Sequence, residues 1–227
     1  MPARRIGGDK LLVRKFDVVG QDSVETSEFV GHVGLANEEK DSSGSLPVVP
    51  MVHMGPPLSQ GAASGPISAI GAVGLTVEEA LQIQVFVNEQ LLEYESAKAG
   101  RRQQYVIAPH MKEEKSRDGT IICRRYNCAG FVIEAYRSAG VDFIQTAQES
   151  LPPVYRSTLE IQYPDMARLL VKSKTREEFG IPGDGPWRLM LAGYVLNALD
   201  RDENELRSVP YTPSAGDEFF PSHRPKA

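Results

Sequence analysis

The feature that most constrains the fold is an amphipathic helix predicted over residues 77–98, the clearest helical pattern in the chain. Thr76 and Glu79 form the S/T-x-x-E capping box that typically begins a helix. The apolar residues on one side of this segment are Ala80, Ile83, Phe86, Val87, Leu91 and Tyr94. Their spacing of three and four residues places them on one stripe of a helix. Because a single apolar stripe needs a partner surface, we expect this helix to pack on a core.

Segments rich in β-branched residues flank this helix and predict strands. The predicted strands cover 11–19, 29–36, 46–55, 104–109 and 119–126. The polar stretch "HMKEEKSRDG" would form the loop of a hairpin between the last two strands. Residues 56–74 are rich in Gly, Pro, Ala and Ser, and we expect a loop there.

A second helical pattern follows the predicted strand at 119–126. It covers residues 129–139, and Gly140 is a typical residue just beyond a helix end. Further helices are expected near 164–173 and over 187–201, where the second could complete the core or dock a partner, with the core favoured. The mixture of strands and helices predicts an α+β fold.

The composition excludes several classes of protein. The 227 residues carry a formal charge of −5, which argues against nucleic acid or an anionic membrane surface as the main partner. No apolar run reaches the ~18 residues that a transmembrane helix needs. The N-terminus lacks the apolar core of a secretory signal. The two cysteines, Cys123 and Cys128, fit a reducing compartment better than a disulfide framework. We therefore expect a cytoplasmic protein without a transmembrane segment.

Two of the four histidines, His32 and His53, lie inside predicted strands. The tetrad "DSSG" at 41–44 favours a β-turn. A turn centred between its two serines would place His32 directly opposite His53. Directly opposed residues point to the same face of a sheet, with Cβ atoms ~5 Å apart. The other two, His110 and His223, are expected at the surface.

Such a pair of histidines has three interpretations. The two rings could be hydrogen-bonded structural residues, two ligands of a metal ion, or a base and the residue that orients it. A metal site needs further ligands at recognisable spacing. The sequence contains no HxxxH, HExxH or CxxC motif, so we expect neither a metal nor another cofactor.

Cys128 stands where a predicted strand turns into a helix. The positive end of the helix dipole would lower the pKa of its thiol. A nearby imidazole could take the thiol proton and return it to a leaving group. Free backbone N–H groups at the helix start could stabilise an oxyanion, and the small residues Ala129 and Gly130 would leave room for substrate. The alternative is an inert cysteine that only packs at the helix start.

Three segments together resemble one protein superfamily. The stretch "YNCAGFVIEAYRSAGVDF" (126–143) resembles the nucleophile segment of NlpC-type cysteine hydrolases, which typically reads Asp-Cys-Ser-Gly, then Phe or Leu, then Val. The stretch "GHVGLA" (31–36) resembles their histidine strand. The stretch "MVHMGPP" (51–57) resembles the second histidine segment of lecithin:retinol acyltransferase-like proteins. Because His32 precedes Cys128, the order resembles the circularly permuted branch of this papain-like superfamily.

The resemblance implies a permuted papain-like domain over residues 10–145, with an antiparallel sheet packed against a helix that starts at Cys128. It implies Cys128 as nucleophile, His32 as general base and His53 as the residue that orients His32. Residues 146–207 are then expected to form a mostly helical extension on this core. Residues 208–227, rich in proline and polar residues, are expected to be a disordered tail.

The chain departs from both subfamilies at the nucleophile. Asn127 and Ala129 stand where the NlpC-type motif has Asp and Ser. The acyltransferase-like proteins usually have Asn-Cys-Glu-His-Phe, and here Ala129 and Gly130 replace the Glu-His pair. The substrate therefore does not carry over from either subfamily.

We expect a thiol-dependent hydrolase, a peptidase or amidase, that acts through a thioester acyl-enzyme on a peptide, amide or acyl substrate. One alternative is a lipid or small-molecule acyltransferase of the same fold. Lipid-acting relatives usually carry a hydrophobic anchor, and none is visible in this sequence, which favours an amide or a small acyl group. Further alternatives of a different class are a catalytically inactive binding module and a zinc-binding protein.

Overall fold

A computed structural model of the chain describes residues 4–5, 11–23, 28–42, 49–55, 57–62, 67–100, 104–162, 164 and 170–223. Its largest sheet has six antiparallel strands, in the spatial order β1 (Arg4–Arg5), β8 (Ala69–Gly71), β3 (Val18–Asp22), β4 (Val30–Ala36), β6 (Pro50–Met54) and β7 (Leu58–Ala62). Three smaller pairs are β2 (Leu11–Val13) with β5 (Lys40–Ser42), β9 (Met111–Lys115) with β10 (Ile121–Tyr126), and β11 (Pro153–Val154) with β12 (Trp187–Arg188).

Six α-helices lie in the described part of the chain. They are α1 (Val77–Ala99), α2 (Cys128–Ser138), α3 (Arg156–Gln162), α5 (Ser173–Glu178), α6 (Ala192–Leu199) and α7 (Glu203–Ser208). Short 3-10 turns are η1 (Gln148–Ser150) and η3 (Pro221–His223). The chain thus has a mixed α+β fold with an antiparallel sheet, as the sequence predicts. None of the helices in these residues is long and apolar enough to cross a membrane.

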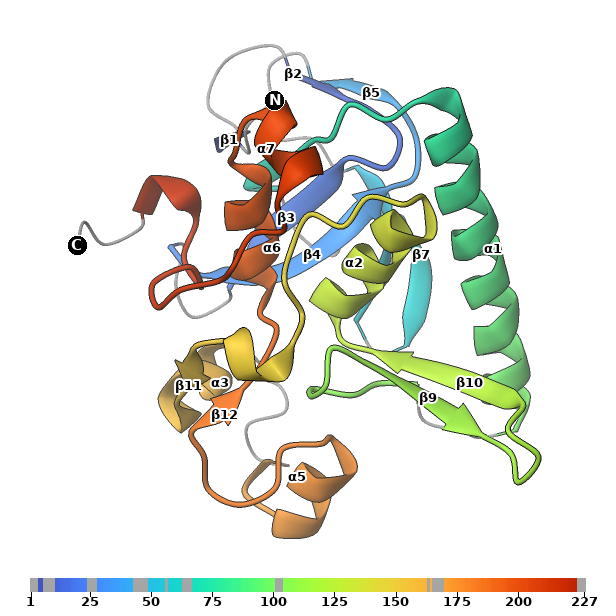
Figure 1. The fold of residues 1–227 in the computed structure, drawn as a ribbon, viewed down its shortest axis with the longest axis vertical. Coiled ribbons are helices and arrows are strands. Elements are labelled where there is room, and N and C mark those ends of the chain that lie inside the picture. Colours follow the sequence, from blue (N-terminus) through green and yellow to red (C-terminus); the bar gives the residue numbers. More distant parts are fainter. Residues whose placement is uncertain are drawn as a thin grey trace.

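Helices α2 and α6 pack side by side on the main sheet (Figure 1). Helix α2 contacts β4 and β6, and α6 contacts β3, β4 and β8. Helix α1 runs along one side of the molecule and contacts α2 and β7 (Figure 1). One continuous set of buried apolar residues joins the sheet to both helices. The core therefore includes residues from before and after position 145.

Helix α6 approaches the sheet closely because two strand positions are glycine. A Cβ atom at Gly20 on β3 would lie 2.5 Å from Leu196 Cδ1. A Cβ atom at Gly71 on β8 would lie 2.6 Å from Leu199 Cδ1. All residues of α6 are buried. The expectation that this C-terminal helix completes the core is thus met, although the helix begins at Ala192 and not at 187.

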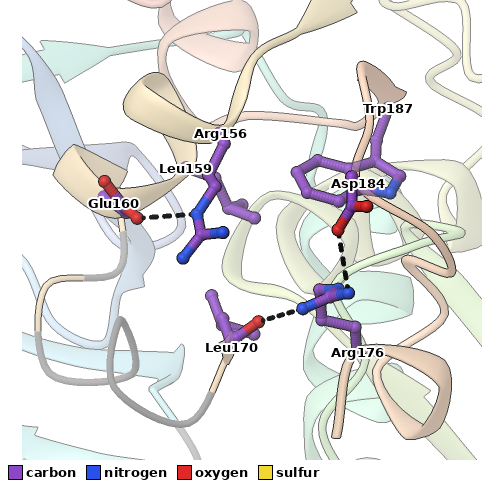
Figure 2. A pocket seen from close by; sticks show the side chains of 7 residues that line it. All are labelled: Arg156, Leu159, Glu160, Leu170, Arg176, Asp184 and Trp187. Carbon is purple, nitrogen blue, oxygen red and sulfur yellow. Dashed lines mark hydrogen bonds and ion pairs between the residues drawn. The ribbon is translucent and has the colours of Figure 1, made fainter. Parts of the chain in front are cut away.

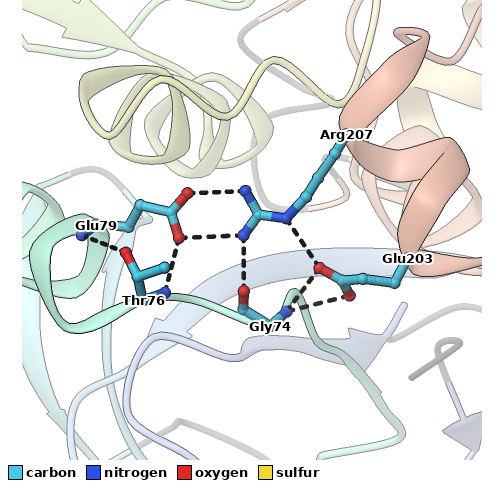
Figure 3. A network of polar contacts seen from close by, with 5 residues as sticks. All are labelled: Gly74, Thr76, Glu79, Glu203 and Arg207. Carbon is cyan, nitrogen blue, oxygen red and sulfur yellow. Dashed lines mark hydrogen bonds and ion pairs between the residues drawn. The ribbon is translucent and has the colours of Figure 1, made fainter.

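Helix α1 begins at the predicted capping box, and contacts from α7 stabilise this helix start. Thr76 Oγ1 accepts from the Glu79 backbone N–H at 3.2 Å, and the Thr76 N–H donates to Glu79 Oε2 at 2.7 Å. Arg207 on α7 donates to both oxygens of Glu79 at 2.7 and 3.0 Å, to the Gly74 carbonyl, and to Glu203 (Figure 3). The Arg207 hydrogen bonds lower the pKa of Glu79 to about 2. These hydrogen bonds and ion pairs hold α7 against the start of α1.

Two strand predictions need correction. The segment predicted as one strand at 11–19 is two strands, β2 and β3, because the chain turns at Phe16, whose φ is 70°. In the 104–126 region, "MKEEK" is not a loop but strand β9, which pairs with β10. Residues 104–109 form no regular strand, and Tyr105 makes an isolated β-bridge with Tyr126. Opposed charges across the pair hold β9 and β10 together, including Arg125 with Glu114 at 3.3 Å.

The C-terminal third also differs from the prediction. The helix expected near 164–173 falls largely outside the described residues, which place α3 before it and α5 after it. Residues 208–223 are not a disordered tail but pack on the core. Phe219 forms an antiparallel β-bridge with Phe29, and Phe220 is 1 % exposed. Asn197 on α6 donates to the Asp217 and Phe219 carbonyls at 2.9 and 2.8 Å. The remaining residues of the expected tail, 224–227, lie outside the described part.

Candidate functional site

His32 lies on β4 and His53 on β6, and these strands are neighbours in the sheet. The paired residues are Leu35 with Val52 and Ala36 with Met51, so the predicted register is wrong by two residues. Extending the observed register places His53 across from Gly34, where an added Cβ would come within 2.8 Å of the His53 Cβ. Because a shift of two residues preserves the strand face, the two histidines still point the same way. They are diagonal neighbours instead of directly opposed.

The register differs because the expected turn does not follow directly on β4. Lys40–Ser42 continues as strand β5 and pairs with β2 at the far edge of the fold. Part of the predicted tetrad, residues 43 and 44, lies outside the described residues. A strand after β4 makes the connection to β6 longer than a tight hairpin, so turn chemistry alone could not set the pairing.

The two imidazoles are in direct contact. His32 Nε2 and His53 Nδ1 are 2.8 Å apart, and the rings meet edge to face with centroids 4.8 Å apart. Burial, and secondarily the neighbouring His53, lowers the pKa of His32 from 6.5 to about 3. Burial also lowers the pKa of His53. Both rings are therefore neutral at physiological pH, and one proton lies between them as a hydrogen bond.

A third polar group extends this contact. Ser59 on β7 is directly opposite His53 in the β6–β7 pairing, and its Oγ lies 3.0 Å from His53 Nε2. Sequence reasoning missed this residue because it assigned 56–74 to a loop. The signal was present in "HMGPPLS", since Met54 pairs with Leu58 across a short connection and the next pair outward is His53 with Ser59.

Asn127 fixes the start of the helix that carries Cys128. Its side-chain oxygen accepts from the Gly130 N–H at 2.7 Å, as a helix N-cap does. Its amide nitrogen donates to the Ile107 carbonyl at 3.0 Å and to the Met190 carbonyl at 3.1 Å. The residue is fully buried. An aspartate could cap the helix but could not donate to two carbonyls, which explains asparagine at this position.

Gly130 serves packing in this structure. A Cβ atom there would lie 1.9 Å from the backbone oxygen of His110, and Ala129 is fully buried. The missing side chain at Gly130 therefore lets α2 pack closely against the His110 backbone. Because this backbone fills the space beside Gly130 and Ala129 is buried, the expectation that the two residues leave room for substrate is wrong.

The Cys128 thiol lies between α2 and the strand that carries His32. Its residue is 3 % exposed. Burial raises the pKa of the Cys128 thiol to about 11, while backbone hydrogen bonding at Val33, Ala129 and Cys128 itself opposes this rise. The helix start does favour the thiolate, as predicted, but burial outweighs it. The expected lowering of the pKa is therefore wrong for the resting protein, in which the thiol is protonated.

Among the described residues, no hydrogen bond joins Cys128 to His32 or His53, although the three residues come from neighbouring elements. Helix α2 packs against β4 and β6, the strands of the two histidines. Hydrogen bonding from the backbone of Val33, the residue after His32, reaches the Cys128 sulfur. The His32 ring uses Nε2 for its contact with His53. Neighbouring elements of the fold thus carry a neutral thiol, a neutral imidazole pair and a serine hydroxyl.

The other candidate residues lie elsewhere. Cys123 is buried on β10, where its Sγ contacts Glu114 Oε2 at 3.4 Å, and both cysteines are free thiols. His110, expected at the surface, lies beside α2 with its side chain 13 % exposed, and its Nε2 is 3.0 Å from Glu134 Oε1. The His223 side chain lies outside the described part. Among the described residues, no group of three or more His, Cys, Asp or Glu could hold a metal ion.

A shallow pocket lies between α3 and α5 and shares no residue with the histidine pair (Figure 2). Its lining residues are Arg156, Leu159, Glu160, Leu170, Arg176, Asp184 and Trp187. Arg156 is paired with Glu160 at 2.9 Å and Arg176 with Asp184 at 3.1 Å. Arg176 also donates to the carbonyls of Leu170, Val171 and Gly183. Since the charges are balanced within the pocket wall, it has no net preference for an anion.

Comparison with models of known protein families found no match to this chain. Comparisons with curated proteins and with solved structures found no match either. The resemblance to the permuted papain-like superfamily therefore rests on its three short segments alone, and the function must be argued from the residues themselves.

Proposed function

We propose that Cys128, His32 and His53 catalyse acyl transfer from an amide or ester through a thioester, as a thiol-dependent hydrolase of permuted papain-like type. The observation that carries this proposal is the 2.8 Å contact between His32 Nε2 and His53 Nδ1. The backbone of Val33, the residue after His32 on the same strand, hydrogen-bonds to the Cys128 sulfur. A base held by a second polar group, beside a nucleophile at a helix start, is the arrangement that covalent catalysis uses.

The chemistry follows from which atoms are free. His32 accepts the Cys128 proton at Nδ1 as the sulfur attacks the carbonyl carbon, which breaks the carbonyl π bond and forms an oxyanion. The backbone N–H groups at the start of α2 are the nearest donors for that charge. The His32 imidazolium then protonates the leaving amine or alcohol, and a thioester forms. Water, deprotonated by His32, attacks the thioester and returns the thiol.

The resting pKa values impose a condition on this sequence. With the thiol pKa near 11 and the His32 pKa near 3, a preformed thiolate–imidazolium pair is strongly disfavoured. Proton transfer must therefore accompany attack instead of preceding it. His53 would stabilise the charge that develops on His32, since its Nδ1 lies 2.8 Å from Nε2 of that ring. This is the reason to expect a large effect from either histidine.

An acyl probe tests the proposal directly. The protein is incubated with p-nitrophenyl acetate and the acetylated residue is located by mass spectrometry. We expect acetyl-Cys128 in the native protein and in Cys123→Ser, none in Cys128→Ser, and formation in His32→Gln slowed by about a hundredfold, the lower end of general base effects. Acetylation of Cys128 no faster in the folded than in the urea-unfolded protein would refute the proposed mechanism.

A second candidate function, a binding module without catalysis, is favoured by the burial of the thiol. Cys128 is 3 % exposed and its raised pKa keeps it protonated. In this case the histidine pair is a structural hydrogen bond that spans β4 and β6. The same acylation experiment separates the two candidates, because a structural pair would leave the acetylation rate unchanged in His32→Gln.

A further inference from the structure

Three side chains form a hydrogen-bonded row across three adjacent strands. His32 on β4 contacts His53 on β6, and His53 contacts Ser59 on β7, at 2.8 and 3.0 Å. The imidazole nitrogens of His53 point in opposite directions, with Nδ1 toward His32 and Nε2 toward Ser59. The hydrogen bond between Ser59 and His53 Nε2, the nitrogen farther from His32, therefore sets the orientation of the His53 ring.

The proposed reaction requires one direction of donation along this row. His32 can accept a proton at Nδ1 only if its own proton is on Nε2, where it donates to His53 Nδ1. His53 Nδ1 is then an acceptor, so its proton is on Nε2 and donates to Ser59 Oγ. Ser59 is the acceptor at the end of the row. In the reverse direction His32 would carry its proton on Nδ1 and could not act as a base.

We propose that Ser59 is a positioning residue, which acts through His53 to keep His32 in the tautomer with a free Nδ1. The proposal rests on the proposed function of Cys128 and His32 and adds to it a residue that touches neither. A serine hydroxyl can accept or donate, so it favours the active direction less strictly than a group that can only accept. A carboxylate at this position can only accept and would enforce it.

Gly55 gives a second geometric reason why the row of hydrogen bonds depends on the orientation of the His53 ring. A Cβ atom at Gly55 would lie 3.2 Å from His53 Nδ1 and 3.6 Å from His32 Cε1. The glycine thus leaves space directly beside the hydrogen bond between the rings. A His53 ring that lost its Ser59 contact would have room to turn, and it would take the Nδ1 acceptor away from His32.

The experiment compares variants at Ser59 in the full chain with Cys123→Ser, so that Cys128 is the single thiol. For Ser59→Ala we expect acetylation of Cys128 by p-nitrophenyl acetate to fall at least about tenfold, less than the 10²–10⁴-fold of a general base itself. Ser59→Thr retains the hydroxyl and should restore the rate, and Ser59→Asp should match or exceed it. The control is Gln60→Ala, an exposed neighbour on β7 that pairs with Val52.

A second readout does not depend on catalysis. Long-range ¹⁵N NMR distinguishes the two neutral tautomers of each imidazole. We expect the Nε2–H form for His32 and His53 in the native protein, and loss of that preference at His53 in Ser59→Ala but not in Gln60→Ala. Unchanged tautomers together with an unchanged rate in Ser59→Ala overturn the role of Ser59. If Cys128 is not acetylated even in the native protein, the proposed function fails, and the tautomers alone decide whether Ser59 positions His53.

Discussion

The substitution Asn127→Asp tests whether the start of α2 is held as the hydrogen bonds indicate. The native side chain accepts one hydrogen bond, from Gly130, and donates two, to the Ile107 and Met190 carbonyls. The aspartate has nearly the same shape and keeps the acceptor. It loses both donated bonds and, when ionised, turns a negative charge toward two buried carbonyl oxygens.

The magnitude follows from these contacts. A buried hydrogen bond contributes about 1 kcal/mol net, and a buried polar group left without a partner costs about 1–3 kcal/mol. Asn127→Ala, which loses all three bonds, should therefore lower the free energy of unfolding by about 3–5 kcal/mol, out of the roughly 5–15 kcal/mol of a typical domain. Asn127→Asp keeps the cap and should cost less at acid pH, where the carboxyl is protonated and can donate one bond.

The sign of the pH dependence separates this explanation from a general loss of packing. Burial beside two carbonyls raises the folded pKa of the introduced carboxyl above the unfolded value of ~3.9 for an aspartate. The folded state then binds a proton more tightly, so stability is lost as pH rises. The deficit of Asn127→Asp relative to the native protein should widen by about 1.4 kcal/mol per pH unit from about pH 4 up to the folded pKa.

The assay is urea unfolding followed by the fluorescence of Trp187, the single tryptophan, and by circular dichroism at pH 4 and pH 7. The control is Asn88→Asp on the exposed face of α1, whose deficit should be small at both values. A deficit in Asn127→Asp that does not grow between pH 4 and pH 7 would refute the assigned hydrogen bonds. Equal stability of Asn127→Asp and the native protein at pH 7 would do so as well.

Three further predictions concern single contacts. Arg207→Gln should lower the free energy of unfolding by about 1 kcal/mol, because its ion pair with Glu79 is partly exposed. The pKa of Glu79 is lowered from 4.5 to about 2, so the loss of stability in Arg207→Gln should be present above pH 4.5 and vanish toward pH 2 in urea titrations. Gly130→Ala should cost about 1–3 kcal/mol by overpacking against the His110 carbonyl, measured in the same way, and no loss would show that α2 can move away. Alkylation of Cys128 by iodoacetamide should stay slow at pH 7–9 and rise toward pH 11, and a plateau near pH 7 would contradict the raised pKa.

Helices α1 and α2 could be predicted from the sequence because their signals are local. The capping box at Thr76 and the apolar stripe after it fix α1, and the N-cap at Asn127 fixes the start of α2. Each signal involves residues within about one helical turn of each other. The face shared by His32 and His53 was also predictable, because it depends only on the two-residue period of the strands.

The features that could not be predicted depend on distant partners. The register of β4 with β6 depends on where Lys40–Ser42 pairs, and its partner Leu11–Val13 lies about thirty residues earlier. The C-terminal residues are polar and rich in proline, yet Asp217 is fully buried and accepts from Tyr211 and Ser214. Such a buried polar network is invisible in composition, which counts residue types and not their hydrogen-bond partners. The raised pKa of Cys128 also depends on distant residues, because burial against the sheet raises this pKa more than the helix start lowers it.

The contacts of Asn127 change what the C-terminal region contributes to the candidate site. The family resemblance covers only residues 10–145, which would make the rest an accessory extension. Yet one of the two carbonyls that hold the Asn127 side chain belongs to Met190, just before α6. Helix α6 in turn packs on β3 and β4, the second of which carries His32. The chain after residue 145 therefore positions the helix that carries the proposed nucleophile, Cys128, and supports the strand that carries the proposed base, His32.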